Sequence, residues 1–157
     1  LSFPVHRPRT YVTSGYQGTL GFAFPTALGA KVGRPDQPVV CVTGDGGFMF
    51  AAQELSTAAQ HGIAVVTVVF NNRAYGNVRR DQANQFGGRV IASDLPPVDY
   101  MKLAQSLGVE AAQTDTPVGL RALLTKAIAA DTPYLVEVTL DLADEVSPWP
   151  LIVPGRG

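Results

Sequence analysis

Two short apolar runs, each followed at once by polar or glycine residues, constrain the fold of this chain most strongly. The first run, Val39–Thr43, is rich in β-branched residues and is closed by Gly44-Asp45-Gly46-Gly47. The second run, Ala64–Phe70, is nearly all aliphatic and ends at Asn71-Asn72. A strand without polar alternation is typical of a parallel sheet that helices cover on both faces. We therefore predict two neighbouring buried strands that end in polar turns.

A helix is predicted between these two strands. Apolar and small side chains recur at three- and four-residue spacing from Phe48 to Ala59, and Gly62 after His61 is a typical helix stop. A strand, a helix and a second strand then follow one another within residues 39–70. This arrangement is a β-α-β unit, which is the building block of parallel sheets.

The same alternation continues on both sides of this unit. Further helices are predicted at 99–107 and 118–130, and further strands at 109–113 and 134–140. Upstream, a strand is predicted at 11–14 and a helix rich in small residues at 18–32, with Pro25 interrupting it near its start. The predicted fold class is α/β, with three layers and a doubly wound, mainly parallel sheet.

The composition fits one compact domain and excludes several classes of function. The chain has 157 residues, of which 46% are hydrophobic and 16% charged, with 12 basic and 13 acidic side chains. It lacks the basic surface of a nucleic-acid-binding protein, and no apolar run is long enough to span a membrane. A single cysteine, Cys41, excludes an internal disulfide and favours a small buried side chain. The low charge content predicts a surface that is buried against another protein.

Two regions are distinguished along the chain. Residues 1–142 carry the predicted strands and helices, whereas residues 143–157 form a proline-rich tail. The first ten residues contain a histidine and two arginines instead of a secretory signal core, so we expect a cytoplasmic protein. The chain begins at Leu1 without an initiator methionine, and we expect it to be part of a longer protein.

Asp45 and the asparagines at 71 and 72 are the candidate ligand-binding residues. In an open α/β sheet, ligands bind outside the carboxyl ends of the strands, so both polar turns face the same crevice. The amides of Gly46 and Gly47 precede a helix and can approach an anion closely. Asp45 would repel that anion unless a divalent cation lay between them, and Mg²⁺ prefers carboxylate and amide oxygens. The pattern indicates a diphosphate that is held through a metal.

Other interpretations of these residues stay open at this stage. A dinucleotide-binding fingerprint that starts at Gly44 would need a glycine where Met49 stands, and the chain has no Gly-Lys-Ser/Thr sequence of a P-loop. Alternatively, Asp45 only caps a helix and the asparagines only turn the chain, which are the commonest roles of these residue types. A nucleotide-binding α/β domain is a further alternative.

The spacing of the two turns resembles a known signature. Gly44-Asp45-Gly46 is followed by the 24 residues from Gly47 to Phe70 and then by Asn71-Asn72. This is similar to the thiamine diphosphate signature, in which Gly-Asp-Gly precedes two asparagines at such a distance. Residues 14–25 also resemble the diphosphate-binding domain of the acetolactate synthase, benzoylformate decarboxylase and pyruvate oxidase group. The similarity extends over nearly the whole chain and indicates a C-terminal diphosphate-binding domain that is truncated at its N-terminal edge.

The resemblance implies thiamine diphosphate and Mg²⁺ as cofactors. The metal ligands that it implies are Asp45, Asn72 and the backbone carbonyl of Ala74. The implied cofactor-binding residues are Gly18, whose carbonyl meets the aminopyrimidine, Leu20, which supports the bent cofactor, Gly46 and Gly47 at the diphosphate, and Tyr75 and Gly76. Judged as bare sequence, Leu20 is more often a core residue, so its role rests on the resemblance.

The resemblance also implies an activity for the protein that contains this domain. That protein would act on a 2-oxo acid, with decarboxylation followed by carboligation as in an acetolactate synthase, which is a transferase. The alternatives are a simple decarboxylase of the benzoylformate decarboxylase type, which is a lyase, and a thiamine diphosphate-binding module without catalysis. In this family the activating glutamate lies on a pyrimidine-binding domain of the same or a neighbouring subunit. We therefore expect a homo-oligomer, no catalytic residue in this chain, and a structural role for Glu54.

Three departures and ambiguities accompany the resemblance. Acetolactate synthases usually carry a Met and then a Trp after the asparagine pair, where this chain has Asn77 and Asp81. Trp149 in the tail either closes over the cofactor or anchors the end of the chain. The arginines near the asparagine pair either bind a substrate carboxylate or lie on a solvated loop, and they are Arg73, Arg79, Arg80 and Arg89.

Overall fold

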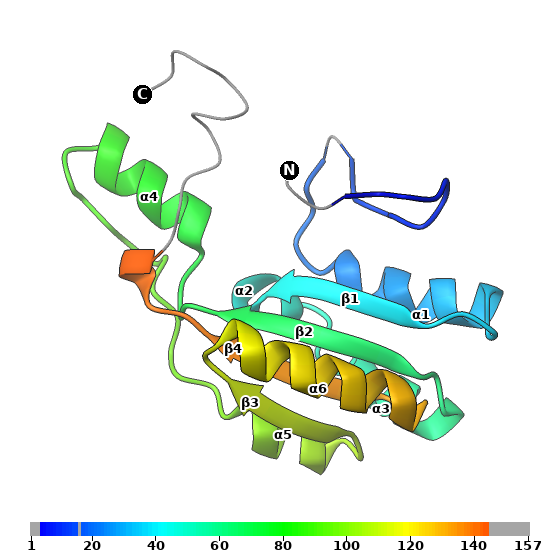
Figure 1. Ribbon diagram of the computed structural model, residues 1–157. Coiled ribbons are helices and arrows are strands. Elements are labelled where there is room, and N and C mark those ends of the chain that lie inside the picture. The colour runs from blue at the N-terminus through cyan, green and yellow to red at the C-terminus, as the bar shows by residue number, and fades with distance from the viewer. Residues whose placement is uncertain (1–3, 16, 145–157) are drawn as a thin grey trace.

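The computed structural model describes residues 4–15 and 17–144, which form a sheet of four parallel strands surrounded by helices (Figure 1). The strands are β1 (Val39–Gly44), β2 (Val65–Asn71), β3 (Glu110–Thr114) and β4 (Tyr134–Thr139). The helices are α1 (Ala23–Gly33), α2 (Asp45–Phe48), α3 (Glu54–His61), α4 (Gly76–Gln85), α5 (Tyr100–Ser106) and α6 (Pro117–Ala130), followed by the 3₁₀ turn η1 (Leu142–Asp144). The strand order is β1-β2-β4-β3, so β4 lies between β2 and β3.

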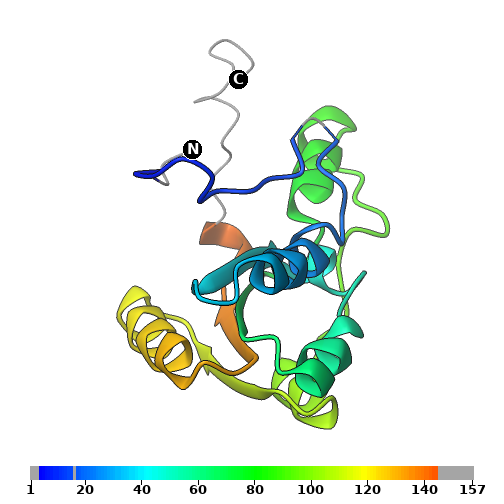
Figure 2. The same ribbon diagram turned by 90° about the vertical axis from the view of Figure 1, so that its right-hand side faces the viewer.

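Helices lie on both faces of this sheet, as Figure 2 shows. On one face, α1, α3 and α5 bury side chains such as Phe24, Leu55 and Tyr100 against the strands. On the other face, α6 packs against a separate cluster that includes Val66 and Val136. Successive strand residues alternate between the two clusters, because side chains of a strand point to opposite faces in turn. The predicted three-layer α/β fold with a parallel sheet is confirmed. The prediction that both strands are buried holds for β2 but is wrong for one face of β1, where Val40 and Val42 are 42% and 62% exposed.

The strand register brings all carboxyl ends to one edge of the sheet, which we call the carboxyl edge; the opposite edge is the amino edge. Gly44, the last residue of β1, pairs with Phe70 of β2, and Asn71, the last residue of β2, pairs with Thr139 of β4. Helix α4 extends away from the carboxyl edge (Figure 1) and buries none of its side chains.

The ends of several helices follow from local sequence. Thr116 precedes α6 and accepts a hydrogen bond from the amide of Gly119 through its Oγ1 at 3.1 Å, and Pro117 occupies the first turn, where its missing N–H costs nothing. Asp99 caps α5 through the amide of Lys102 at 2.9 Å. Gly62 ends α3 in the left-handed conformation that glycine adopts without strain.

Four further sequence-based expectations about these elements are corrected. Residues 11–14 form no strand, since none of the described strands lies beside them to pair with their backbone. Helix α1 begins at Ala23 instead of residue 18, because Gly18 and Gly21 have positive φ angles of 55° and 82°, which no right-handed helix accommodates.

The other two corrections concern helices. The helix predicted after Phe48 is divided into α2 and α3 by a turn with hydrogen bonds between residues three apart, such as Glu54 N to Ala51 O at 3.0 Å. The region of the arginines contains α4, so the expectation of a solvated loop is wrong for Arg79 and Arg80. The expectation for Cys41 is confirmed, since its side chain lies in the core.

Among the described residues, no helix is long and apolar enough to cross a lipid bilayer. The predicted proline-rich tail, with Trp149, lies almost entirely outside the residues that the structure describes. The division into residues 1–142 and 143–157 therefore stays a prediction.

Candidate metal and diphosphate site

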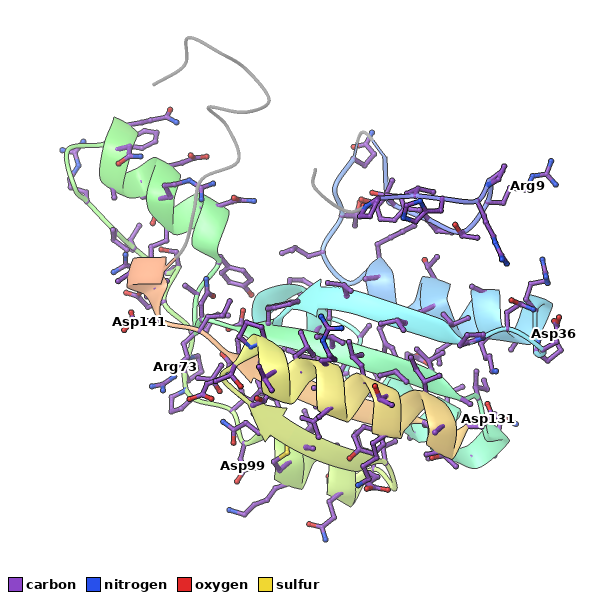
Figure 3. All side chains as sticks on the ribbon, viewed as in Figure 1. Arg9, Asp36, Arg73, Asp99, Asp131 and Asp141 are labelled. Carbon is purple, nitrogen blue, oxygen red and sulfur yellow. The ribbon has the colours of Figure 1, made fainter. Side chains whose placement is uncertain are left out.

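The candidate site lies at the carboxyl edge, where β1 and β2 end beside each other. Because Gly44 pairs with Phe70 in the sheet, β1 ends at Gly44 one position before the end of β2 at Asn71, and the chain leaves both strands at neighbouring points. Asp45 therefore starts α2 next to the turn formed by residues 71–74, which we call the asparagine turn. Figure 3 marks this edge by Arg73, Asp99 and Asp141, and the opposite edge by Asp36 and Asp131.

Asp45 is a buried carboxylate. It is only 3% exposed, and its Oδ1 accepts a hydrogen bond from the amide of Gly46 at 2.9 Å. Burial raises the pKa of Asp45, while the backbone amides of Gly46, Arg73 and Ala74 act to lower it. Within the described part of the chain, no lysine or arginine forms an ion pair with Asp45. A bound cation would supply the charge that this environment lacks.

The asparagine turn is held by the side chains of both asparagines. Asn71 Oδ1 accepts a hydrogen bond from the amide of Arg73 at 3.1 Å, and Asn72 Oδ1 accepts one from the amide of Ala74 at 3.2 Å. Arg73 adopts a positive φ of 56°, which is unusual for a residue with a side chain. Because the amides of Arg73 and Ala74 influence the pKa of Asp45, this turn lies against the Asp45 carboxylate.

A second segment fixes the outer side of the asparagine turn. The amide of Tyr75 donates to the carbonyl of Ser93 at 2.8 Å, and the amide of Leu95 donates to the carbonyl of Arg73 at 2.8 Å. These bonds frame an isolated antiparallel bridge between Ala74 and Asp94. Their geometry leaves the Ala74 carbonyl without a hydrogen-bond donor among the described residues.

The donor set at this edge fits Mg²⁺. It comprises the Asp45 carboxylate, the Asn72 amide oxygen and the Ala74 carbonyl oxygen, and hard oxygen ligands of these kinds are the ones that Mg²⁺ takes in proteins. In the described ranges, no group of three or more His, Cys, Asp or Glu side chains could hold a metal ion. A metal at this edge would thus combine one carboxylate with neutral oxygens and leave other positions for a phosphate and water.

The two glycines after Asp45 differ in what surrounds them. A Cβ at Gly46 would lie 2.6 Å from ring atoms of Tyr75, so only glycine permits the asparagine turn to pack this closely on α2. A Cβ at Gly47 would lie 3.3 Å from Thr43 Oγ1 and 3.7 Å from Leu20 Cδ2. Two of the implied cofactor residues therefore flank the start of α2: Leu20, which precedes it in the sequence, and Tyr75, which follows it.

The remaining implied residues lie around the same edge. Leu20 is 49% exposed, so the core position that sequence alone favoured is wrong. Gly18 lies in the irregular segment before α1 with a positive φ of 55°, and Gly76 is the first residue of α4. Glu54 begins α3 and accepts a hydrogen bond from Thr57 Oγ1 at 2.8 Å, a local contact that agrees with a structural role.

The arginines do not converge on one point. Arg79 Nε is 2.6 Å from Asp94 Oδ1, and Arg80 contacts Asn77 one turn earlier on α4. Arg73 and Arg89 have exposed side chains, with Arg73 at the carboxyl edge (Figure 3).

Sequence reasoning missed two buried residues, Glu137 and Tyr100, whose polar groups interact with the site. Glu137 in β4 is 5% exposed and its Oε1 accepts a hydrogen bond from Asn71 Nδ2 at 2.6 Å. Tyr100 in α5 is 2% exposed; burial chiefly, and then the charges of Asp45 and Glu137, raise the pKa of its phenol. A charged residue inside the apolar run Tyr134–Leu140 was the signal that could have identified Glu137.

A comparison with known proteins identifies the family. Residues 1–138 match the family model described as "Thiamine pyrophosphate enzyme, C-terminal TPP binding domain". The chain belongs to this family. Thiamine pyrophosphate (TPP) is another name for thiamine diphosphate, so the family resemblance is confirmed, together with the cofactor prediction of TPP with Mg²⁺.

Individual relatives agree with this membership. The TPP-binding domain described here is 41% identical over 154 residues to a probable acetolactate synthase large subunit of Methanococcus aeolicus, covering 98% of this chain and 25% of that protein. It is 34% identical over 155 residues to acetolactate synthase isozyme 1 large subunit of Escherichia coli, covering 98% and 27%. The chain thus spans about a quarter of the length of the curated relatives it matches.

A solved structure matches the fold as well. It is the thiamine diphosphate-dependent 4-hydroxybenzoylformate decarboxylase of Rhodococcus jostii RHA1, with a TM-score of 0.74 and 35% identity. The match covers 79% of this chain and 24% of that one. The domain therefore shares its fold with part of a much longer TPP-dependent enzyme.

Proposed function

We propose that this domain is the cofactor-binding part of a TPP- and Mg²⁺-dependent enzyme that decarboxylates a 2-oxo acid and joins the product to a second carbonyl compound, as an acetolactate synthase does. The observation that carries this proposal is the similarity to acetolactate synthase large subunits over 98% of the chain. The buried Asp45 carboxylate beside the asparagine turn, which has no cationic partner among the described residues, supports it from the structure.

In this proposal Asp45, Asn72 and the Ala74 carbonyl hold Mg²⁺, and the Gly46 and Gly47 amides bind the diphosphate. The further cofactor contacts are the Gly18 carbonyl, the Leu20 side chain, Tyr75 and Gly76. When bound, TPP supplies the electron sink that decarboxylation of a 2-oxo acid needs. The residues of this domain bind the cofactor, orient it and exclude water from it.

No residue of this chain is proposed to react with substrate. The activating glutamate comes from a pyrimidine-binding domain of the same or a neighbouring subunit in a homo-oligomer, and the chain alone is inactive. Large apolar side chains near the carboxyl edge support such a partner, because Leu20, Met49 and Phe50 are 49%, 42% and 58% exposed. Burying them against a second domain would remove that apolar surface from water.

A simple decarboxylase is the second candidate function. The solved structure that resembles this domain is, by its title, a 4-hydroxybenzoylformate decarboxylase. In addition, Asn77 and Asp81 lie on α4 at the places where acetolactate synthases usually have a Met and a Trp. Release of an aldehyde in place of carboligation would follow if no second carbonyl compound were bound beside the cofactor.

The test is a product screen of the full-length protein with TPP and Mg²⁺. Several 2-oxo acids, including pyruvate and benzoylformate, are supplied with and without a second 2-oxo acid or an aldehyde. Formation of a 2-hydroxy ketone or acetolactate-type product supports the synthase, whereas CO₂ with free aldehyde supports the decarboxylase. Cofactor binding without turnover of any substrate would favour a non-catalytic module, and turnover by the isolated chain would contradict the need for a partner domain.

A further inference from the structure

Glu137 is the most conspicuous buried charge that the proposed function does not use. It lies in the interior of β4, pairs in register with Val69 of β2 and Gln113 of β3, and is 5% exposed. In the part of the chain that the structure describes, no cation forms an ion pair with its carboxylate. A buried charge of this kind costs free energy unless hydrogen bonds compensate for it, and an apolar side chain would fill the strand at lower cost.

The compensating hydrogen bond comes from Asn71. Its Nδ2 donates to Glu137 Oε1 at 2.6 Å, a short distance that is typical of a bond to a charged acceptor. Asn71 is itself only 6% exposed, and its backbone carbonyl accepts a hydrogen bond from the amide of Leu140 at 2.9 Å. The asparagine is thus fixed at both its side chain and its backbone.

A carboxylate determines which way the Asn71 amide group points. An ionised carboxyl group only accepts hydrogen bonds, so it takes the NH₂ side of the amide and leaves Oδ1 on the other side. That oxygen accepts from the amide of Arg73 at 3.1 Å. Arg73 is the residue of the asparagine turn with a positive φ, a conformation that this bond helps to hold.

The same turn then presents Asn72 and Ala74 to the site. Since Arg73 lies between them, its conformation sets where the Asn72 side chain and the Ala74 carbonyl point. A chain of hydrogen bonds therefore runs from Glu137 through Asn71 to the backbone between the two neutral metal ligands. Glu137 also acts on the same phenol as Asp45, that of Tyr100, which places its charge on the side of the sheet where the metal would bind.

We propose that Glu137 is a positioning residue for the metal: by fixing the orientation of the Asn71 amide it holds the asparagine turn in the geometry that binds Mg²⁺. This inference rests on the proposed function. It differs from a purely structural role because it predicts that changes at Glu137 reach the metal only through Asn71.

The test measures Mg²⁺ affinity by titration calorimetry, in the full-length protein freed of cofactor and then saturated with TPP. We expect Glu137→Leu to raise the Kd for Mg²⁺ about 10- to 100-fold, the range found when a residue that orients a metal ligand is lost. Glu137→Gln should raise it less, because glutamine keeps an oxygen that can accept from Asn71 but no longer excludes the flipped amide. Glu110→Gln is the matched control: Glu110 lies at the amino end of β3, is exposed, and should leave the Kd unchanged.

A second set of variants distinguishes a positioning role of Glu137 from general destabilisation of the fold. In an Asn71→Ala background, Glu137→Leu and Glu137→Gln should raise the Kd no further, because the link to the asparagine turn is already lost. If Glu137→Leu does not fold, the comparison of Glu137→Gln in the two backgrounds decides alone.

Two results would overturn the inference. The first is an unchanged Mg²⁺ affinity in both Glu137 variants; the second is an equal loss with and without Asn71. Wild-type protein that binds Mg²⁺ and TPP normally in such an experiment would leave the proposed function intact. Wild-type protein that fails to bind them would overturn the proposed function and this inference together.

Discussion

The two edges of the sheet each bury an ion, and they treat it differently. At the amino edge, Lys31 of α1 is 8% exposed, and its Nζ donates to the carbonyls of Pro35 and Gln37 at 2.9 and 3.1 Å and lies 3.4 Å from Asp131 Oδ1. Pro35 and Gln37 precede β1, and Asp131 precedes β4. The Lys31 ammonium group therefore connects the two loops that lead into these strands. The chain itself satisfies this cation.

At the carboxyl edge, Asp45 is buried more deeply, and its carboxylate accepts a hydrogen bond from the amide of its neighbour Gly46 but forms no ion pair with a lysine or arginine of the described residues. Leaving a buried carboxylate without a counter-ion destabilises a domain, and the amino edge shows that this fold can provide one. The carboxyl edge is therefore arranged for a cation from outside the chain.

The largest effect is expected for Asp45→Asn in the full-length protein. This change removes the only carboxylate from the proposed set of metal ligands. Loss of a residue that merely orients a metal ligand already weakens metal binding by about 10- to 100-fold. We expect Mg²⁺-dependent TPP binding, measured by calorimetry, to weaken by at least about 100-fold, or about 2.7 kcal/mol. The cofactor-free variant should be no less stable than wild type, because an amide needs no counter-ion.

The control for Asp45→Asn is Asp36→Asn at the amino edge. Asp36 is exposed and pairs with Arg34 at 3.7 Å, so the same change of charge should leave TPP binding unaltered. Wild-type binding by the Asp45 variant would show that the carboxyl edge does not depend on this carboxylate, and the comparison would fail.

The second prediction concerns how closely the asparagine turn packs on α2. Gly46→Ala would place a Cβ 2.6 Å from the Tyr75 ring, so the ring and the turn behind it must move. We expect a loss of about 1–3 kcal/mol in the free energy of unfolding, measured with urea, together with weaker Mg²⁺ binding.

Gly29→Ala in α1 is the matched control for this substitution. A Cβ at Gly29 would meet nothing within 4 Å, so this change should be neutral or stabilising by up to about 1 kcal/mol. Equal stability of the Gly46 and Gly29 variants would mean that the Tyr75 contact does not restrain the turn.

The third prediction removes the cation of the amino edge. Lys31→Met keeps the apolar stem but takes away the donor to two carbonyls, and we expect a loss of about 1–2 kcal/mol in the free energy of unfolding. Mg²⁺ and TPP affinities should stay at the wild-type level, because the ammonium group serves the fold and no ligand.

Arg34→Met provides the reference for an exposed pair at the same edge. The Arg34 and Asp36 side chains are 68% and 67% exposed, so this change should cost less than about 1 kcal/mol. A reduced TPP affinity in the Lys31 variant would show that the two edges are coupled and would weaken the comparison.

The sequence allowed the β-α-β unit and the site at its edge to be predicted because the signals there are local. Each apolar run specifies its own strand, and Asp45 and Asn72 follow those strands directly, so the parallel arrangement alone brings them together. The close packing of the Tyr75 ring on Gly46 could not be predicted in this way, because it is a contact between residues that are far apart in the sequence.

What could not be predicted depends on non-local contacts or on weak patterns. Helix α4 has no apolar face, and it buries no side chain, so periodicity gave no indication of it. The link from Glu137 to Asn71 requires β4 to lie beside β2, whereas sequence order alone would place β3 there. Buried polar residues of this kind are recognised only once the strand order is known.

The smallest effect is expected at Cys41, in the apolar core between the two edges. Cys41 lies midway along β1, and burial raises the pKa of its thiol from 9.0 to about 12. The folded protein holds this proton more tightly than the unfolded chain does. The contribution of the thiol to the free energy of unfolding is therefore complete below its pKa in the unfolded chain, and it is lost as the pH rises toward its pKa in the folded protein. Relative to Cys41→Ala, wild-type protein should therefore keep a constant difference in unfolding free energy at neutral pH and lose part of it above about pH 9.

Thiol labelling gives an independent readout of the same burial. At about pH 8 a thiol reagent should modify Cys41 of the native protein far more slowly than that of urea-unfolded protein, since the thiolate is scarce and shielded. Rapid labelling of the native protein would place Cys41 in contact with water. The burial of Cys41 in the core would then be wrong, and its thiol would make no pH-dependent contribution to stability.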